Sequence, residues 1–332
     1  MTPAANSSSA PAAPPARGSA VGAAALVGRV LNGRYRLLAP LGAGASGQVL
    51  LADDVALRRR VAVKVLHPAL AADGAFLRRF RAEAQAAAAL NRPNILAVYD
   101  WGEDGLPFLV SELLGGGSLR AVLDSGRLLT PSQALVVGLD ACRGLHYAHG
   151  RGIVHRDIKP ANLIFGEDRR LRIADFGLAR ALAEAAWTEP EGVILGTARY
   201  ASPEQADGAE LDAKSDVYSL ALVLVEAVTG EAPHAAGTVL ATLRARSGRA
   251  IDPPAELGAL RKAVALAGRA DPNQRVDARG FGLALMRAAE ALPRPTPLPL
   301  APPPSPVPGA AGEATELGGP PFEEAPRRLA RA

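Results

Sequence analysis

The sequence contains a single cysteine, Cys142, which excludes a disulfide within the chain and is typical of proteins that fold in a reducing compartment. Cys142 stands in the apolar run ALVVGLDACRGL, so we expect a small buried side chain rather than a reactive thiol. Long apolar runs are also missing. The best candidate, VYSLALVLVEAV at residues 217–228, contains Glu226 and is shorter than the roughly 18–20 residues that cross a bilayer. It predicts a buried helix and no membrane span.

Neither sign of charge is in large excess. The chain has 37 Lys and Arg residues against 33 Asp and Glu, and the basic residues are scattered, which argues against a nucleic-acid surface. The start, MTPAANSSSAPAAPPARG, lacks the charged first region of a signal peptide. These absences predict a cytoplasmic protein. A hydrophobic content of 48% over 332 residues is enough for one large domain or two small ones.

Both ends of the chain differ in composition from its middle. Residues 1–33 are rich in Ala, Pro and Ser, which predicts a disordered N-terminal tail. Residues 293–332 begin PRPTPLPLAPPPSPVPG, which favours an extended, disordered tail with polyproline II character. We expect this tail to be a plain tether. The alternative is that a partner with an aromatic proline-reading groove binds residues 293–308.

The middle of the chain changes pattern once. Residues 34–112 contain short β-rich runs and one Ala-rich helical stretch, FLRRFRAEAQAAAALN, whereas helical periodicity dominates residues 113–292. No internal repeat is visible. The pattern predicts an α+β fold with a small sheet lobe followed by a larger helical lobe.

The first candidate site is the glycine cluster LGAGASGQV, with Gly42, Gly44 and Gly47. In a dinucleotide-binding fold such a cluster opens a helix, but here the sequence continues as strand, turn and strand. The glycines therefore cap a hairpin. Its tip can lie over phosphates and donate backbone N–H groups, although an ordinary glycine-rich turn fits this segment equally well.

A lysine in the following strand strengthens the phosphate interpretation. Lys64 ends VAVK, and an unpaired ammonium among apolar neighbours would be costly to bury. It needs an anion and a carboxylate, and the next helical stretch supplies Glu83. The alternative is that Lys64 extends to the surface.

The stretch VHRDIKPANL concentrates polar residues around a helix-breaking proline. A loop here can aim Asp157 and Asn162 into one cleft. Asp157 would accept a proton from a hydroxyl, Lys159 would neutralise charge, and the Asn162 carbonyl would bind a hard cation. Asp175 follows a short apolar strand in IADFG and would complete the metal site.

Several motifs now stand in a recognisable order, namely G-x-G-x-x-G-x-V, VAVK, HRDIKPAN, DFG and SPE. In this order they resemble the protein kinase superfamily. The segments GTARYASPEQ and DAKSDVYSLALVLVEAVTGEAP are most similar to bacterial Hanks-type serine/threonine kinases. The resemblance covers about residues 34–292. It implies a bilobal kinase domain with an N-lobe at 34–112 and a C-lobe at 113–292.

The resemblance implies an ATP site in which the three glycines cover the triphosphate and Val49 and Ala62 pack on adenine. Lys64 would hold the α- and β-phosphates and pair with Glu83 in the active enzyme. Magnesium, with manganese as a possible substitute, would be held by Asn162 and Asp175. The full set of nucleotide-binding positions is Leu41, Gly42, Gly44, Gly47, Val49, Ala62, Lys64, Glu112, Leu114 and Ile164.

For catalysis, the resemblance implies that Asp157 is the base and that Lys159 contacts the γ-phosphate. Thr197 would brace both, which favours Ser/Thr over Tyr substrates. The substrates would be proteins, including the chain itself, and a homodimer would serve autophosphorylation. Ser111 would guard the pocket behind adenine, and its small side chain predicts that bulky inhibitors enter. A departure from the family is Ala87, smaller than the usual apolar residue one turn after Glu83.

Other positions carry structural or regulatory expectations. Glu204 would pair with Arg275, and Asp216 would anchor the catalytic loop from a helix beneath it. Arg156 would clamp a phosphate on the segment between DFG and SPE. Either that phosphate sits on Thr188, or the nearby Glu189 and Glu191 replace it.

Two alternatives from other classes remain to be weighed. A nucleotide-gated pseudokinase scaffold would be expected to lack Lys64, Asp157 or Asp175, and all three are present. A small-molecule phosphotransferase of kinase-like fold would not be expected to keep GTARYASPEQ, the segment that docks a peptide.

Overall fold

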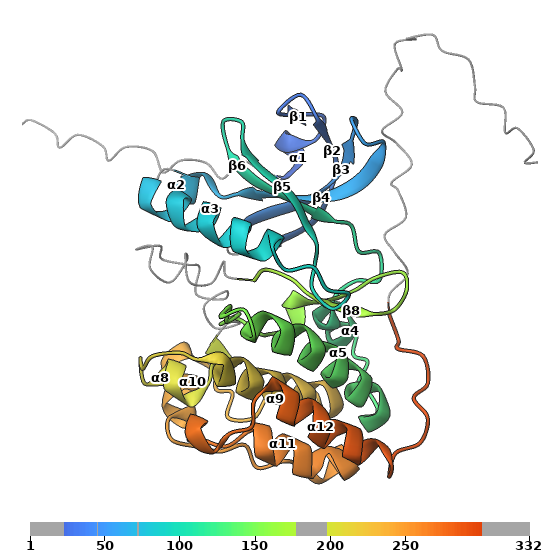
Figure 1. The fold of residues 1–332 in the computed structure, drawn as a ribbon, viewed down its shortest axis with the longest axis vertical. Helices are drawn as coiled ribbons and strands as arrows, with labels where there is room; N and C mark the ends of the chain where they lie inside the picture. The colour runs from blue at the N-terminus through green and yellow to red at the C-terminus, as the bar shows by residue number, and fades with distance from the viewer. Residues whose placement is uncertain (1–22, 45, 72, 177–197, 301–332) are drawn as a thin grey trace, which may run out of the picture.

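The computed structural model describes residues 23–300 except 45, 72 and 177–197. Figure 1 shows two lobes, with the β-sheet of the N-terminal part above a larger assembly of helices. This arrangement confirms the predicted α+β, bilobal fold, including the order of the lobes along the chain.

The small lobe is built on one antiparallel sheet with the strand order β1-β2-β3-β4-β6-β5. Alternation along β4 places Val61, Val63 and Val65 in the lobe's core, while Lys64 projects from the other face. The strands are β1 (Val30–Leu31), β2 (Tyr35–Gly44), β3 (Gly47–Asp54), β4 (Arg59–Leu66), β5 (Val98–Glu103) and β6 (Pro107–Glu112).

One long helix packs against this sheet. Helix α3 (Gly74–Ala88) follows the short α2 (Pro68–Ala71) and begins at Asp73, whose carboxylate accepts hydrogen bonds from two N–H groups of the first turn. Phe76, Phe80 and Ala84 recur at intervals of four and are buried. This helical spacing fixes the face that α3 turns toward β5 and β6.

Structure begins earlier than the sequence analysis expected. Residues in the segment assigned to the N-terminal tail form α1 (Ala23–Leu26) and β1, and they bury Leu26 and Leu31 beside Tyr35. Local composition could not indicate this, because a short apolar pair in an Ala-rich segment gains stability only from a surface formed by distant strands.

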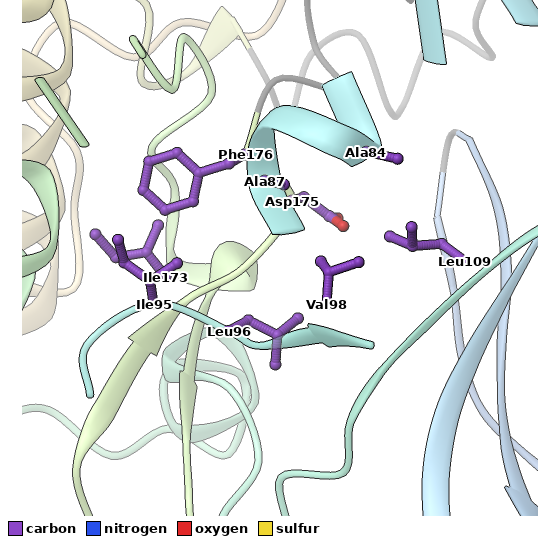
Figure 2. A pocket seen from close by; sticks show the side chains of 9 residues that line it. All are labelled: Ala84, Ala87, Ile95, Leu96, Val98, Leu109, Ile173, Asp175 and Phe176. Carbon is purple, nitrogen blue, oxygen red and sulfur yellow. The ribbon is translucent and has the colours of Figure 1, made fainter. Parts of the chain in front are cut away.

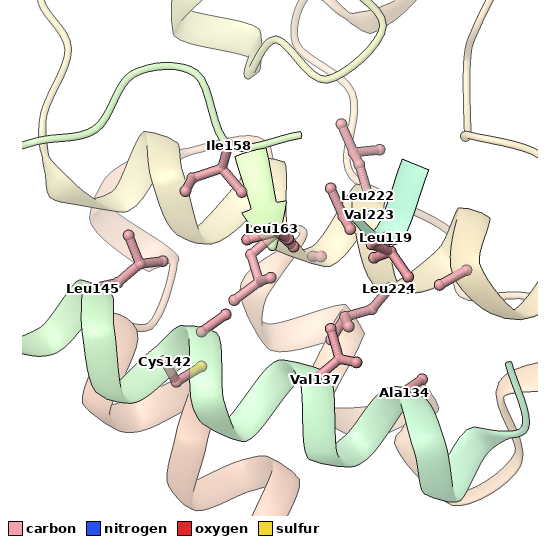
Figure 3. Close-up of a cluster of buried hydrophobic side chains, with 14 of the residues drawn as sticks. Leu119, Ala134, Val137, Cys142, Leu145, Ile158, Leu163, Leu222, Val223 and Leu224 are labelled. Carbon is pink, nitrogen blue, oxygen red and sulfur yellow. The ribbon is translucent and has the colours of Figure 1, made fainter. Parts of the chain in front are cut away.

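The large lobe is organised around two buried helices, α5 (Pro131–His149) and α9 (Ala213–Thr229). Helix α9 contains the apolar run of residues 217–228, and every residue of that run is buried, as predicted. Across the described parts of the chain, none of the helices combines the length and the apolar character needed to span a membrane. Cys142 lies on α5 among the apolar side chains in Figure 3, and its burial raises the pKa of the thiol.

The remaining elements surround these two helices. The strands β7 (Leu163–Phe165) and β8 (Leu171–Ile173) form a hairpin on the side of the large lobe that faces the small lobe. The remaining helices are α4 (Leu119–Asp124), η1 (Pro160–Asn162), α8 (Pro203–Ala206), α10 (Val239–Arg246), η2 (Ala255–Leu260), α11 (Arg261–Ala267), η3 (Pro272–Gln274) and α12 (Ala278–Ala289).

The first residues of the predicted C-terminal tail also pack on the large lobe. The Gln133 side chain donates hydrogen bonds to the Thr296 hydroxyl (3.1 Å) and the Pro297 carbonyl (3.0 Å). Leu298 and Leu300 are partly buried against the lobe's core. The segment 293–300 thus lies on the domain surface, outside any helix or strand, rather than leaving it directly after α12.

Candidate active site

The roof of the inter-lobe cleft is the hairpin β2–β3. Gly44 pairs with Gly47 at its tip, so the glycines do cap a hairpin. Gly47 has φ +153°, and a Cβ atom there would lie 2.0 Å from the Val65 carbonyl oxygen, so only glycine fits. By contrast, no atom lies within 4 Å of a Cβ built on Gly42 or Gly44. The chain's own packing therefore does not require glycine at these two positions.

Further residues of the roof come from β3 and β4. Val49 and Lys64 are opposite each other in the antiparallel pair, so both side chains project from the same face. Ala62 follows the same alternation and is opposite Ser111 of β6. Leu41, also predicted at this site, is more than one-third exposed.

Lys64 is held by a carboxylate from the other lobe. Its Nζ lies 2.8 Å from Asp175 Oδ2, just beyond the end of β8. Desolvation opposes ionisation of Asp175, but attraction and the hydrogen bond from Lys64 outweigh it and hold its pKa below the usual value. The structure pairs Lys64 with Asp175 rather than with Glu83. The Lys64–Glu83 pair expected for the active enzyme stays a prediction.

A small apolar pocket adjoins this ion pair. Figure 2 shows Asp175 between the end of α3 and the strands of the small lobe. The contribution of α3 to the wall is two alanines, Ala84 and Ala87, which leave room that larger side chains would fill. The other lining residues are Ile95, Leu96, Val98, Leu109, Ile173 and Phe176.

The loop before β7 brings three polar side chains together. Lys159 Nζ lies 2.8 Å from Asp157 Oδ2. The Asn162 amide nitrogen donates to the Asp157 carbonyl (2.8 Å) and to its carboxylate (3.1 Å). Pro160 begins η1, the turn that returns the chain and places Asn162 against Asp157. The loop also reaches Asp175, since Ala174 N donates to the Asn162 carbonyl (2.8 Å).

His155 connects the loop to the segment carrying Asp175. Its Nδ1 accepts from Asp157 N (3.2 Å), so Nε2 carries the proton and donates to the Ala174 carbonyl (2.7 Å). Its ring stands edge-on to Phe176, 4.7 Å between centroids. His155 is fully buried, and its two ring nitrogens bind backbone groups on both sides of the site. The sequence analysis assigned no role to His155.

Asp216 of α9 anchors the same loop from below. Its carboxylate accepts hydrogen bonds from His155 N (2.8 Å) and Arg156 N (2.7 Å), and it also contacts His149 Nε2 (2.8 Å). Arg156 has φ +69°, a conformation that the two bonds help to hold. The Arg156 side chain is half-buried.

The hinge between the lobes begins at the end of β6. Ser111 is buried at the position predicted to guard the rear pocket. Glu112 and Leu114 follow it and are half-buried. Ile164 of β7 lies directly opposite Arg172 of β8 in the hairpin below.

A buried ion pair supports the lower part of the site. Arg275 Nη1 lies 2.7 Å from Glu204 Oε1, and the Ser215 hydroxyl donates to the same oxygen (2.6 Å). Desolvation opposes ionisation of Glu204, but the hydrogen bonds from Arg275 and Ser215 outweigh it and lower its pKa. Arg275 also donates to backbone carbonyls, including that of Lys214.

Two residues that the sequence analysis missed act at the margins of the site. Arg246 is fully buried and donates to the carbonyls of Arg199 (2.8 Å) and Ala201 (2.9 Å), and so positions the segment before SPE. Arg172 binds the hinge Glu112. No local pattern marks these roles, because Glu112 and the backbone partners of Arg246 are distant in sequence. Thr188, Glu189, Glu191 and Thr197 lie outside the described residues, so their roles stay predictions.

Comparisons with known proteins agree with this geometry. A family model described as the protein kinase domain matches residues 35–250. The serine/threonine-protein kinase PknB of Mycobacterium leprae is 47% identical over 208 residues, or 61% of this chain and 33% of PknB. PknL of Mycobacterium tuberculosis is 44% identical over 212 residues, or 64% of this chain and 53% of PknL. The match thus spans about a third to a half of these relatives.

Solved structures give the same result for the fold. The crystal structure of the Mycobacterium tuberculosis PknI kinase domain has a TM-score of 0.62 and 30% identity, and the match covers 79% of this chain and 98% of that domain. The family model alone covers well over half of the chain. This chain therefore belongs to the protein kinase family and is similar throughout that domain to bacterial Hanks-type serine/threonine kinases.

Proposed function

We propose that the chain transfers the γ-phosphoryl group of Mg·ATP to serine and threonine hydroxyls of proteins, including other copies of itself. The observation that carries this proposal is the convergence of Asp157, Asn162, Asp175 and Lys64 on one cleft. Lys64 comes from the roof and the other three from the floor. Lys64 pairs with Asp175 at 2.8 Å, and the Asn162 amide donates to the Asp157 carbonyl at 2.8 Å. The Asp157 carboxylate is itself 2.8 Å from Lys159 Nζ.

The roof suits a nucleotide triphosphate. Gly42 and Gly44 have open space where a side chain would be, and a phosphate chain would use that space. Backbone N–H groups of the hairpin tip would then bind phosphate oxygens. Val49 and Ala62 offer an apolar face to adenine from above, and Ile164 offers one from below. Leu41, Glu112 and Leu114 would complete the adenine site.

The floor suits a hard divalent cation. The Asn162 amide nitrogen is bound to Asp157, so its oxygen is the remaining ligand atom, and no donor to that oxygen is seen among the described residues. Asp175 Oδ1 is likewise the carboxylate oxygen not bound to Lys64. Oxygen ligands of this kind fit Mg²⁺, and Mn²⁺ as a substitute. When bound, the cation would neutralise phosphate charge.

The chain's own residues would perform the remaining tasks. Asp157 would orient the substrate hydroxyl and accept its proton as the oxygen forms a bond to the γ-phosphorus. The bond from that phosphorus to the bridging oxygen breaks, and ADP leaves with the electron pair. Lys159 would shift from Asp157 toward the γ-phosphoryl oxygens, and Lys64 from Asp175 toward the α- and β-phosphates. The rate gain comes from positioning and charge neutralisation.

Protein substrates are favoured over small molecules by the segment around SPE. It is held by the capping box of Ser202 and Gln205, and Gln205 Nε2 also donates to the Arg156 carbonyl (3.0 Å). This contact links the docking segment to the catalytic loop. Cytoplasmic location, a homodimer for autophosphorylation and a phosphate on Thr188 clamped by Arg156 remain parts of the same proposal, as does the bracing role of Thr197.

The test uses ATP labelled on the γ-phosphate, with the chain itself and a set of Ser/Thr-containing proteins as acceptors. Asp157→Asn should lower incorporation by about 10²- to 10⁴-fold, because it removes a positioned base. Lys64→Ala should also be nearly inactive. The matched control, Asp252→Asn, changes an exposed carboxylate and should behave as wild type.

Two outcomes would redirect the proposal. Nucleotide binding without transfer to any polypeptide would indicate a pseudokinase scaffold. Transfer only to small alcohols would indicate a small-molecule phosphotransferase.

Mass spectrometry of the labelled chain, compared with the Thr188→Ala variant, then shows whether Thr188 is the modified residue. Full activity of that variant would favour Glu189 and Glu191 as the replacement.

A further inference from the structure

Arg172 joins two carboxylates from different parts of the molecule. Its Nη1 and Nη2 donate to the two oxygens of Asp168 at 2.9 and 3.1 Å, a bidentate arrangement across the β7–β8 turn. Its Nε lies 3.2 Å from Glu112 Oε2, at the start of the hinge. A guanidinium suits this task because its donors form a planar fork. The side chains of Arg172 and Glu112 are only 17% and 18% exposed, so solvent screens their contact little, whereas the Asp168 side chain is 44% exposed.

Glu112 is bound on its other side to the segment that follows α3. Its Oε1 accepts from Ala97 N (2.8 Å), and its own N–H donates to the Ala97 carbonyl (2.9 Å). That segment is also tied to β8, since Leu96 N donates to the Ile173 carbonyl (3.0 Å) and Ile173 N donates to the Asn94 carbonyl (3.0 Å). The Glu112 side chain is therefore committed to holding the backbone of the hinge.

The position of Arg172 relates this network to the nucleotide. Arg172 and Ile164 are directly opposite in the β7–β8 ladder, so their side chains project from one face of the hairpin. Ile164 is the residue proposed to contact adenine from below. Glu112 is the last residue of β6, where the proposed adenine contacts of the hinge begin. The ionic contact thus connects the hinge with the floor, two of the surfaces that adenine would contact.

We propose that Arg172, clamped by Asp168 and bonded to Glu112, is a positioning residue that sets the spacing between hinge and floor for nucleotide binding. The inference rests on the proposed kinase function. Arg172 touches neither the reacting atoms nor the catalytic loop, so it affects affinity for ATP rather than phosphoryl transfer. Without it, Glu112 keeps Ala97, whose segment is bonded to β8 through Leu96, but it loses its direct ionic contact with the floor, and ATP binding must then order the Glu112 side chain itself.

The experiment compares Arg172→Gln with Arg170→Gln, a change of the same charge at an exposed position of the same hairpin. Arg172→Gln should raise the Kd of a fluorescent ATP analogue and the KM for ATP by about tenfold, as expected for a lost charge-assisted hydrogen bond, and leave kcat within about twofold. Arg172→Lys keeps the charge without the fork and should lie between. Arg170→Gln should match wild type.

A double-mutant cycle with Asp168→Asn separates positioning from general stability. Asp168 also accepts a hydrogen bond from Arg170 N (3.1 Å), which the amide oxygen introduced by Asp168→Asn can keep, so on this inference the substitution affects nucleotide binding through Arg172. The double variant should then bind the analogue no more weakly than Arg172→Gln alone. Additive effects, equal behaviour of Arg172→Gln and Arg170→Gln, or a fall in kcat with unchanged KM would each overturn the inference.

The Kd readout also distinguishes the two proposals. If wild type binds the analogue but phosphorylates nothing, the proposed function fails while the cycle still tests Arg172. If wild type binds no nucleotide, both are overturned.

Discussion

Lys64 Nζ lies 2.8 Å from Asp175 Oδ2, in an ion pair that joins the small lobe to the large lobe. Each partner has a different proposed task in the loaded enzyme, Lys64 on phosphates and Asp175 on a cation. The pair therefore keeps two oppositely charged groups neutralised until their ligands arrive, because a buried charge without a partner is costly. On the proposed function, binding of Mg·ATP would exchange one set of ionic contacts for another.

This exchange predicts that nucleotide and metal stabilise the chain together. Mg·ATP should raise the melting temperature of wild type, whereas ATP with a chelator should raise it much less and phosphorylation should cease. ATP alone would place its negative charge beside Asp175 without compensation. Differential scanning fluorimetry with and without Mg²⁺ measures this. An equal shift by ATP in the presence of chelator would contradict the assignment of Asp175 and Asn162.

The small side chain of Ser111, together with Ala84 and Ala87 of α3, predicts that bulky ATP-site inhibitors can enter the pocket in Figure 2. Ser111 is paired with Val98, which lines this pocket, and with Ala62 on its other side, so Ser111→Met would place a long side chain beside the pocket. Inhibitors with a bulky group behind adenine should then lose at least about tenfold in affinity. Competition assays against ATP measure the loss. A compact inhibitor that does not reach past Ser111 is the control, and equal losses for both compounds would contradict this account.

The Glu204–Arg275 pair predicts a large effect on stability. Glu204→Gln leaves Arg275 fully buried without its counter-charge, and breaking a buried pair in this way costs about 3–5 kcal/mol. Urea denaturation measures the change in the free energy of unfolding. Glu210→Gln, at an exposed position of the same segment, should change it by less than about 0.5 kcal/mol. A similar change in the free energy of unfolding for both variants would contradict a stabilising role of the buried Glu204–Arg275 pair.

The contact between Arg34 and Asp54 predicts part of the acid sensitivity. Two hydrogen bonds from Arg34, at 2.8 Å each, lower the pKa of Asp54 to about 2. Since the folded pKa lies below the unfolded value of about 3.9, this contribution to stability is complete above pH 4 and is lost as the pH falls toward 2. Unfolding free energy measured from pH 5 to 2 should fall less steeply in Asp54→Asn. An unchanged slope would refute the assignment.

The segment 293–300 predicts that the domain does not end at α12. Truncation after Leu292 removes Leu298 and Leu300 from the core surface and deprives Gln133 Nε2 of its acceptors on Thr296 and Pro297. The melting temperature should fall by about 2–8 °C, whereas truncation after Leu300 should leave it unchanged. A partner that reads the proline-rich sequence at 293–308 would have to displace this segment. Equal melting temperatures of the two truncated chains would contradict the assignment of residues 293–300 to the folded domain.

The sequence by itself determined the order of the lobes, the buried helix α9 and the positions of the catalytic motifs. These features are local: strand and helix periodicities are read within one segment, and Pro160 and Gly47 impose backbone geometry on their own neighbours. The resemblance to protein kinases also implied the pairing of Glu204 with Arg275, which the structure contains. The candidate site residues were thus named before any coordinates, and their catalytic and binding roles stay predictions.

Only the tertiary structure decided which charges meet. The pairing of Lys64 with Asp175, the tautomer of His155 and the contact of Arg172 with Glu112 each join residues from separate elements. So do the burial of Leu26 and the docking of residues 296–300 on Gln133. An ion pair or a buried contact depends on distance and solvent exposure in three dimensions, and composition along the chain does not record either quantity.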